Sequence, residues 1–274
     1  MMSRFDIDRL AVILRDAAKA EILPRFRHLD AGMIRQKTDA IDLVTEADEQ
    51  AERRIKAAVE LAWPDALFVG EESVAARPAL LEELNAAEFA IVVDPVDGTA
   101  NFAAGLPLFA TMAAVVRNGE TIAGIIYDPM GDDWVLAEKG GGAWQRRPDG
   151  TQWRLKVAPA PGLADLVGHV SITFLTADSK PKVLANLAKL KVAANYRVAG
   201  HDYRTFATGF SHFVVFNKLM PWDHLAGSLI SQEAGGYVAR FDGSSYLPSH
   251  RDGGLLIASD PDTWNLLRSE VFTV

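Results

Sequence analysis

The sequence contains no cysteine among its 274 residues. Disulfide bonds, zinc–thiolate sites and a cysteine nucleophile are therefore excluded. The chain also lacks a run of the roughly 20 apolar residues that a membrane helix needs. Residues 1–26 lack the uncharged apolar stretch of a signal peptide. We therefore expect a cytoplasmic protein with no membrane partner.

Several common catalytic and nucleotide-binding motifs are also missing. There is no Walker A loop, no G-x-G-x-x-G and no H-E-x-x-H, and the six histidines show no metal-ligand spacing. Ser73 stands outside a G-x-S-x-G context. The glycines from Gly140 to Gly142 are better explained as a turn. The sequence thus offers no plausible nucleophile.

Basic residues are outnumbered, which gives a net charge of −8 and a pI of about 5.3. This balance disfavours nucleic acid as a partner, because phosphate neutralisation needs clustered Lys and Arg. An acidic chain can still bind a phosphate ester if bound cations reverse the local field. The length and the 49% hydrophobic content suit one large globular domain or two intimately packed ones.

The hydrophobic pattern divides the chain into two parts, 1–150 and 151–274, at a Pro-rich polar stretch. The first part resembles an α+β arrangement, with a first helix ending near Pro24 and, along the chain, a helix over 46–62, strands at 66–73 and 89–94 and a meander over 108–147. The second part alternates as α/β proteins do, with strands at 166–172, 194–200, 212–217, 237–243 and 254–260 and helices at 179–190, 201–209 and 222–236. Asn118-Gly119 predicts a hairpin inside the meander.

A predicted strand runs directly into two acids, Asp94 and Asp97, in the segment D-P-V-D-G-T. One interpretation is a turn, since Asp-Pro and Asp-Gly are good turn formers. The other is that both carboxylates bind one divalent cation at the strand end. Gly98 would then allow close approach, and Thr99 would offer a hydroxyl and an amide. The segment alone leaves both interpretations open.

Other acids also have a structural explanation when they are taken singly. Glu71 and Glu72 follow a short strand, where adjacent acids are usually solvated. Asp48 stands three residues after Thr45, which matches a capping box. Asp223 lies at the start of a predicted helix and suits its N-cap.

One similar motif is excluded by spacing. Phosphatases of the haloacid dehalogenase type carry D-x-D-G-T after a strand, with the first Asp as nucleophile. Here two residues separate Asp94 from Asp97. The additional residue changes the direction in which the second carboxylate points relative to the first, so we reject that class.

The order of the acidic segments is more informative than any one of them. The segments D-A-I-D-L-V-T-E-A-D (39–48), G-E-E-S (70–73), D-P-V-D-G-T-A-N-F (94–102) and W-D-H-L-A-G…E-A-G-G (222–236) occur in that order. Together they resemble the inositol monophosphatase family of lithium-sensitive, Mg²⁺-dependent phosphomonoesterases, over roughly residues 35–240. The resemblance implies a layered αβαβα sandwich of the inositol monophosphatase and fructose-1,6-bisphosphatase type, and a homodimer.

The resemblance also implies a set of metal ligands. The Mg²⁺ ligands would be Glu71, Asp94, Asp97, Asp223 and the backbone carbonyl of Val96. Two to three ions are expected, Mn²⁺ would substitute, and Li⁺ would inhibit. Carboxylates and substrate phosphate are the usual partners of Mg²⁺. Two ions about 4 Å apart can hold the attacking and leaving oxygens of an in-line displacement.

The resemblance assigns the catalytic residues as Asp48, Thr99 and Glu71, with Asp48 and Thr99 polarising the attacking water. The backbone amides of Gly98 and Thr99 would hold the phosphate, at the start of a helix. Lys37 matches a lysine near this site in the family.

The substrate end departs from the family pattern. Members that favour inositol phosphates carry an acid seven residues before the position of Asp223, where this chain has Phe216. Gly200, His201 and Asp202 are candidate substrate contacts, although smaller residues are common at the positions of His201, Asp202 and Tyr203. Packing in the core or at a helix start would explain His201 and Tyr203 equally well.

Two functions from different classes follow. The first is hydrolysis of a small polyol or sugar phosphate, with inositol monophosphate as the default and histidinol phosphate, fructose 1,6-bisphosphate or adenosine 3′,5′-bisphosphate as alternatives. The second is a regulatory binding protein that retains the fold. The complete set of acids favours the first.

Overall fold

The computed structural model describes residues 5–29, 32, 34–36 and 43–273. Helices span Ile7–Ala17 (α1), Glu46–Ala62 (α2), Glu71–Ala76 (α3), Leu80–Ala86 (α4), Thr99–Ala103 (α5), Lys180–Leu187 (α6), Ala199–Ala207 (α7), Pro221–Glu233 (α8) and Pro261–Glu270 (α9). Strands span Ile34–Gln36 (β1), Leu43–Thr45 (β2), Leu67–Gly70 (β3), Phe89–Asp97 (β4), Ala110–Arg117 (β5), Glu120–Asp128 (β6), Asp133–Glu138 (β7), Ala143–Arg146 (β8), Gln152–Arg154 (β9), Val167–Val170 (β10), Val192–Ala194 (β11), Phe213–Phe216 (β12), Tyr237–Arg240 (β13) and Leu255–Ala258 (β14).

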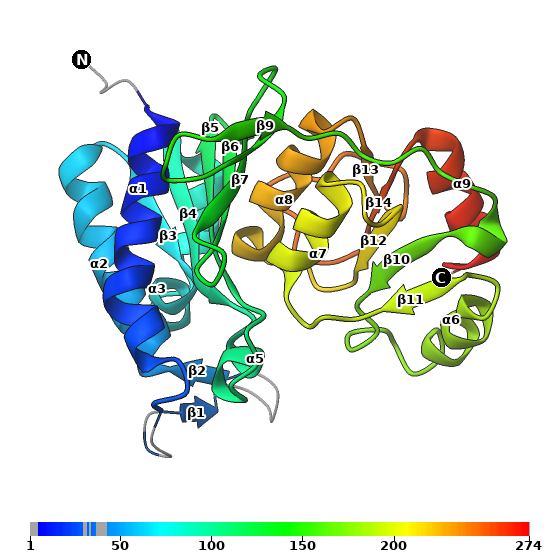
Figure 1. The fold of residues 1–274 in the computed structure, drawn as a ribbon, viewed down its shortest axis with the longest axis horizontal. Coiled ribbons are helices and arrows are strands. Elements are labelled where there is room, and N and C mark those ends of the chain that lie inside the picture. Colours follow the sequence, from blue (N-terminus) through cyan, green and yellow to red (C-terminus); the bar gives the residue numbers. More distant parts are fainter. Residues whose placement is uncertain (1–4, 30–31, 33, 37–42, 274) are drawn as a thin grey trace.

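These elements form five layers, which confirms the predicted αβαβα sandwich. Figure 1 shows α1 and α2 on the outer face of a first sheet, α7 and α8 between the two sheets, and α6 and α9 beyond the second. The first sheet has the order β3-β4-β5-β6-β7-β8-β9, and the second β11-β10-β12-β14-β13. Separate apolar clusters fill the spaces on either side of each sheet. None of the described helices has the length and apolar character needed to cross a membrane.

The N-terminal helices form where the sequence predicts them. Asp6 caps α1 by accepting hydrogen bonds from the amides of Asp8 and Arg9, and Leu10 and Leu14 are fully buried against α2 and the sheet. The helical path continues beyond α1 as a π-helical turn and then a 3-10 turn that ends at Arg25. The helix predicted over 46–62 is confirmed as α2.

The first sheet carries the predicted meander. Strands β3 and β4 are parallel, and every later neighbour in this sheet is antiparallel. Asn118 and Gly119 have φ of 50° and 76° and join β5 to β6, which confirms the hairpin. The sheet extends to Arg154, and the division of the chain at residue 150 stays a prediction.

The strand predicted over 194–200 is wrong. Strand β11 ends at Ala194, and α7 already begins at Ala199. Arg197 has a φ of 59°, in the left-handed region, which breaks the extended path. The carboxylate of Asp97 then accepts hydrogen bonds from the amides of Ala199 and Gly200, so a contact with β4 fixes where the helix starts.

Helix α8 occupies the centre of the molecule and is buried along most of its length. A Cβ atom at Gly227 would lie 2.1 Å from the ring of Tyr203, so this glycine is needed for the close packing of α7 on α8. Met220 is the N-cap of α8, and Asp223 lies in the first turn. The prediction of Asp223 as N-cap is therefore wrong by three residues, because Pro221 already takes the first helical position.

Candidate functional site

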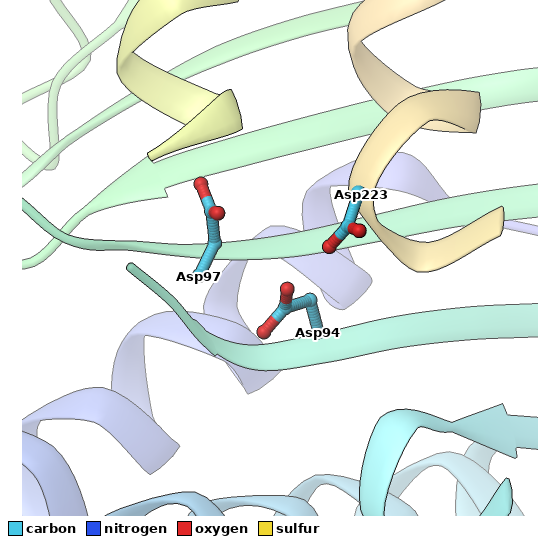
Figure 2. Close-up of side chains that lie close together, drawn as sticks. All are labelled: Asp94, Asp97 and Asp223. Atoms are coloured by element: carbon cyan, nitrogen blue, oxygen red, sulfur yellow. The ribbon is translucent and has the colours of Figure 1, made fainter. Parts of the chain in front are cut away.

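The end of β4 brings two carboxyl groups to one side. All nine residues of β4 are buried. Residues three apart in a regular strand face opposite sides of the sheet. Here the pairing with β5 shifts between Asp94 and Asp97, so three steps along β4 match two along β5. Such a bulge changes the direction of side chains, and both carboxyl groups reach the same region (Figure 2).

A third carboxyl group comes from α8. Figure 2 shows Asp223 reaching from the first turn of α8 toward Asp94. One carboxylate oxygen from each of Asp94, Asp97 and Asp223 lies within 4.8 Å of the others. Residues 129 positions apart in the chain thus form one acidic cluster at the meeting point of the first sheet and the central helices.

A cavity of about 230 Å³ opens onto this cluster. Its wall contains Glu71, Asp94, Val96, Asp97, Gly98, Thr99, Asp202, Phe216 and Asp223 among the residues that the sequence singles out. Asp48, Gly200 and His201 are not part of this wall. Lys37 lies outside the described residues.

Two of the predicted substrate contacts have structural partners instead. The amide of Gly200 donates a hydrogen bond of 2.5 Å to Asp97 Oδ2. The ring of His201 lies 3.2 Å from the carbonyl oxygen of Phe109 through Nε2, so this nitrogen donates. These partners favour packing and anchoring of α7 over direct contact with a ligand.

Asp48 reaches the cavity through Thr99. Asp48 is fully buried near the start of α2, where its Oδ2 accepts hydrogen bonds from the amide and the hydroxyl of Thr45 in the predicted capping box. Its other oxygen, Oδ1, lies 3.0 Å from the hydroxyl of Thr99. The carbonyl oxygen of Val96 is also 2.9 Å from that hydroxyl. The single hydroxyl proton therefore has two acceptors available, one of them ionisable.

Gly98 makes the turn from β4 into α5. Its φ is 86°, and an added Cβ would lie 3.0 Å from the side chain of Val198 and 3.2 Å from the carbonyl of Leu108. Both the left-handed conformation and the space favour glycine here. The turn places Gly98 and the first residues of α5, Thr99 and Ala100, in the cavity wall next to the acids.

Burial and the neighbouring negative charges disfavour ionisation of the carboxyl groups in the acidic cluster. Burial raises the pKa of Asp97 to about 7, and burial together with the charges of Glu71 and Asp97 raises that of Asp223 to about 8. Burial, followed by the charge of Glu71, also raises the pKa of Asp94. Asp94 Oδ1 is fully buried and has no hydrogen-bond partner. Clustered carboxylates with an unsatisfied buried oxygen fit a hard divalent cation.

A model of the inositol monophosphatase family matches residues 6–270. The chain belongs to the inositol monophosphatase family. It is therefore a phosphatase, a hydrolase of phosphoric monoesters. Its acidic cluster of Asp94, Asp97 and Asp223 is a group that can bind metal ions.

Individual relatives agree with this assignment. An inositol-1-monophosphatase of Mesorhizobium japonicum is 33% identical over 223 residues, which cover 80% of this chain and 79% of the relative. A Vibrio cholerae protein named Nus factor SuhB is 30% identical over 224 residues, with 80% and 79% covered. The crystal structure of the extragenic suppressor protein suhB from Bartonella henselae is 26% identical and superposes with a TM-score of 0.81 over 97% of both chains.

Phe216 and Asp202 are two further buried residues of the cavity wall. Phe216 is buried in the wall, and its ring lies 4.4 Å from that of His224. Asp202 is also buried there, and its Oδ1 lies 3.2 Å from Nδ1 of His169. Besides Glu71 and the acidic cluster, the wall therefore contains one more carboxyl group, that of Asp202 on α7.

Several residues in or behind the cavity wall were not singled out from the sequence. Lys218 and Arg197 bring positive charge to the wall, and Lys218 Nζ lies 5.2 Å from the ring centre of Phe174. His169 lies in no local motif, and its contact with Asp202 arises only from the packing of β10 against α7. No sequence pattern marked these residues, because they come from separate loops and strands.

The raised pKa values predict how stability depends on pH in the metal-free protein. Asp48 and Asp97 have pKa values of about 7 and Asp223 of about 8 in the folded state, with burial as the first cause, against about 3.9 in an unfolded chain. The folded state thus binds more protons across this window, so its stability falls as pH rises from about 4 to about 8.

We expect the melting temperature of chelator-treated protein to fall by several degrees between pH 5.5 and pH 8.5, since about 1 kcal/mol shifts it by roughly 2–4 °C at this size. Excess Mg²⁺ should remove most of this fall, because a bound cation stabilises the ionised carboxylates. Differential scanning calorimetry at both pH values checks the expectation. A melting temperature that rises with pH in chelator would contradict it.

Proposed function

We propose that this family member is a Mg²⁺-dependent phosphomonoesterase that hydrolyses a small polyol or sugar phosphate, with inositol monophosphate as the default substrate. The observation that carries the proposal is the convergence of Asp94, Asp97 and Asp223 in one cavity. Gly98, Thr99 and Ala100 line the same cavity, and Asp48 reaches it through the hydroxyl of Thr99.

The ion-binding residues in this proposal are Glu71, Asp94, Asp97, Asp223 and the carbonyl of Val96, all of which border the cavity. They offer only oxygen atoms, as Mg²⁺ prefers, and we expect two to three ions, replacement by Mn²⁺ and inhibition by Li⁺. Bound Mg²⁺ supplies Lewis-acid chemistry, which makes water a stronger nucleophile and stabilises a leaving alkoxide.

The side chains of Thr99 and Asp48 orient the attacking water. The Thr99 hydroxyl donates to Asp48 Oδ1 at 3.0 Å, which leaves a lone pair on Oγ1 to accept a hydrogen bond from the water. Asp48 takes up positive charge that develops along this chain, as a general base does. The amides of Gly98 and Thr99 hold the phosphate. The proposed reaction involves no covalent intermediate on a side chain.

At the alcohol end, Asp202 and Phe216 are the proposed contacts. Asp202 offers a carboxyl group that can accept a hydrogen bond from a substrate hydroxyl, and Phe216 offers an apolar surface. Gly200 and His201 would support these contacts from behind the wall by holding α7 in place. Other phosphate esters, including histidinol phosphate and the two bisphosphates named above, remain alternative substrates.

The first test is a panel of phosphate monoesters assayed with Mg²⁺ and with excess chelator. We expect turnover of polyol and sugar phosphates that needs Mg²⁺, is restored by Mn²⁺, and is inhibited by Li⁺. Chelator should reduce turnover to the background rate, because the carboxylates have no other means of activating water. Activity that survives full chelation would contradict the mechanism.

A second candidate function is regulation through a macromolecular partner. One observation favours it: a relative 30% identical is named Nus factor SuhB. The net charge of −8 makes a protein partner more suitable than direct nucleic-acid binding. A stable partner in a pull-down, combined with no turnover of any ester, would reverse the ranking of the two functions.

Family membership also underlies our proposals of a homodimer and of a cytoplasmic location.

A further inference from the structure

Helix α2 carries a second buried acid that no part of the proposed chemistry uses. Glu52 is 4% exposed and lies four residues after Asp48, so both side chains project from the same face of the helix. Asp48 turns toward Thr99. Glu52 turns toward the start of α3, where Glu71 is the first residue, and it is not part of the cavity wall.

The carboxylate of Glu52 holds the first turn of α3. Its Oε2 accepts a hydrogen bond of 2.7 Å from the amide of Glu72. Its Oε1 accepts bonds of 2.7 Å and 2.6 Å from the amide and the hydroxyl of Ser73. The first amides of a helix have no partner within the helix, and the N-cap residue Gly70 has no side chain to serve them. Glu52 therefore supplies the cap from a neighbouring helix.

Gly70 makes room for this contact. A Cβ atom at Gly70 would lie 2.3 Å from Cδ of Glu52 and 2.4 Å from its Oε2. The φ of Gly70 is −104°, which any residue can adopt, so the need for glycine comes from the space. Each residue of the segment G-E-E-S thus has a role. Gly70 leaves room for Glu52, and Glu71 lines the cavity. Glu72 donates its amide to Glu52, and Ser73 donates both its amide and its hydroxyl.

We propose that Glu52 is a positioning residue that fixes the first turn of α3 and thereby aims Glu71 at the bound cation. Glu71 stands between Gly70, which touches Glu52, and Glu72, which is hydrogen-bonded to it. The backbone therefore lies close to Glu52 on one side of Glu71 and is hydrogen-bonded to it on the other. The three donors satisfy the charge of Glu52, which keeps Glu52 itself from competing as an ion ligand. The inference rests on the proposed function, in which Glu71 binds the ion.

The test is a titration of the whole chain with Mn²⁺, in which electron paramagnetic resonance measures the concentration of unbound Mn²⁺. We expect Glu52→Gln to raise the Mn²⁺ dissociation constant by about 10–100-fold, the usual effect of changing a residue that orients a metal ligand. The amide nitrogen of glutamine cannot accept from Glu72, so one end of the turn is released. Glu60→Gln, an exposed change on the same helix, should leave the constant unchanged.

A second readout separates positioning from general structural damage. The Mg²⁺ concentration for half-maximal activity should rise by a similar factor in Glu52→Gln, whereas kcat at saturating Mg²⁺ should fall only a few-fold. A fall in kcat at saturating Mg²⁺ with an unchanged Mn²⁺ dissociation constant would overturn the proposal. If Glu52→Gln does not fold, Ser73→Ala takes its place as the test, because it removes one of the three hydrogen bonds to Glu52. It should raise the Mn²⁺ dissociation constant about threefold. An unchanged constant would overturn the positioning role of Glu52.

The wild-type measurement distinguishes the two levels of inference. A wild-type chain that binds no Mn²⁺ would overturn the ion site of the proposed function, and the role of Glu52 with it. Tight binding by the wild type and equally tight binding by Glu52→Gln would overturn the role of Glu52 alone. Tight wild-type binding that is weakened in Glu52→Gln but not in Glu60→Gln supports both.

Discussion

Replacing Asp94 by asparagine should lower kcat/KM by about 10³-fold or more, which corresponds to about 4 kcal/mol of transition-state stabilisation. Asp94 is buried, faces Asp223, and has a carboxylate oxygen without a hydrogen-bond partner. An amide of the same shape keeps the packing but removes the charge that attracts the ions. Steady-state kinetics over a range of Mg²⁺ concentrations measures the effect.

The same substitution should stabilise the protein in chelator. After the larger effect of burial, the charges of Glu71, Asp97 and Asp223 raise the pKa of Asp94. A neutral amide removes that repulsion, and its nitrogen can donate to Asp223. The melting temperature above pH 7 should therefore rise while activity is lost. Glu60→Gln, an exposed change on α2 outside the cavity wall, should alter neither quantity. Wild-type activity in Asp94→Asn, or loss of activity through unfolding, would contradict the assignment.

The acidic cluster was accessible from the sequence because its parts lie in short contiguous segments. D-P-V-D-G-T contains Asp94, Asp97 and the glycine of the following turn, and Trp222-Asp223 opens a helix with a strong apolar pattern. Local rules place each segment at the end of a strand or the start of a helix. The family resemblance then supplied what local rules cannot, namely that the ends of these elements meet.

The remaining features depend on contacts between distant segments. The strand predicted to continue to Gly200 ends at Ala194, because Arg197 turns the chain and Asp97 holds the start of α7. The shifted register between β4 and β5 has no sequence pattern of its own. His169 meets Asp202 only across two elements.

Glu52 is an intermediate case. Its spacing of four residues from Asp48 was visible in the sequence, and it predicts a shared helix face. The spacing does not reveal what that face contacts. The three hydrogen bonds to Glu72 and Ser73 come from the packing of α2 against the end of β3, which is tertiary information.

Replacing Asp48 by asparagine should lower kcat by about 10²–10³-fold, within the range of a lost general base, while Mn²⁺ binding changes less than about threefold. Asp48 does not border the cavity and reaches it only through the hydroxyl of Thr99. The loss should therefore fall on the chemical step, with little effect on the ions. Single-turnover kinetics and Mn²⁺ titration measure the two quantities separately.

The Thr99 hydroxyl provides the matched comparison. Thr99→Ser keeps the hydroxyl and should retain most activity, whereas Thr99→Ala breaks the same chain as Asp48→Asn and should lose a similar factor. Because the two groups act as a unit, the double variant should be little worse than either single variant. Asp48 also belongs to the capping box at the start of α2, so a variant can lose stability as well as activity. The melting temperature of each variant must therefore be measured together with its kinetics. Additive losses in the double variant, or a Mn²⁺ affinity that falls as far as kcat, would show that Asp48 acts on the ions or the fold instead of the water.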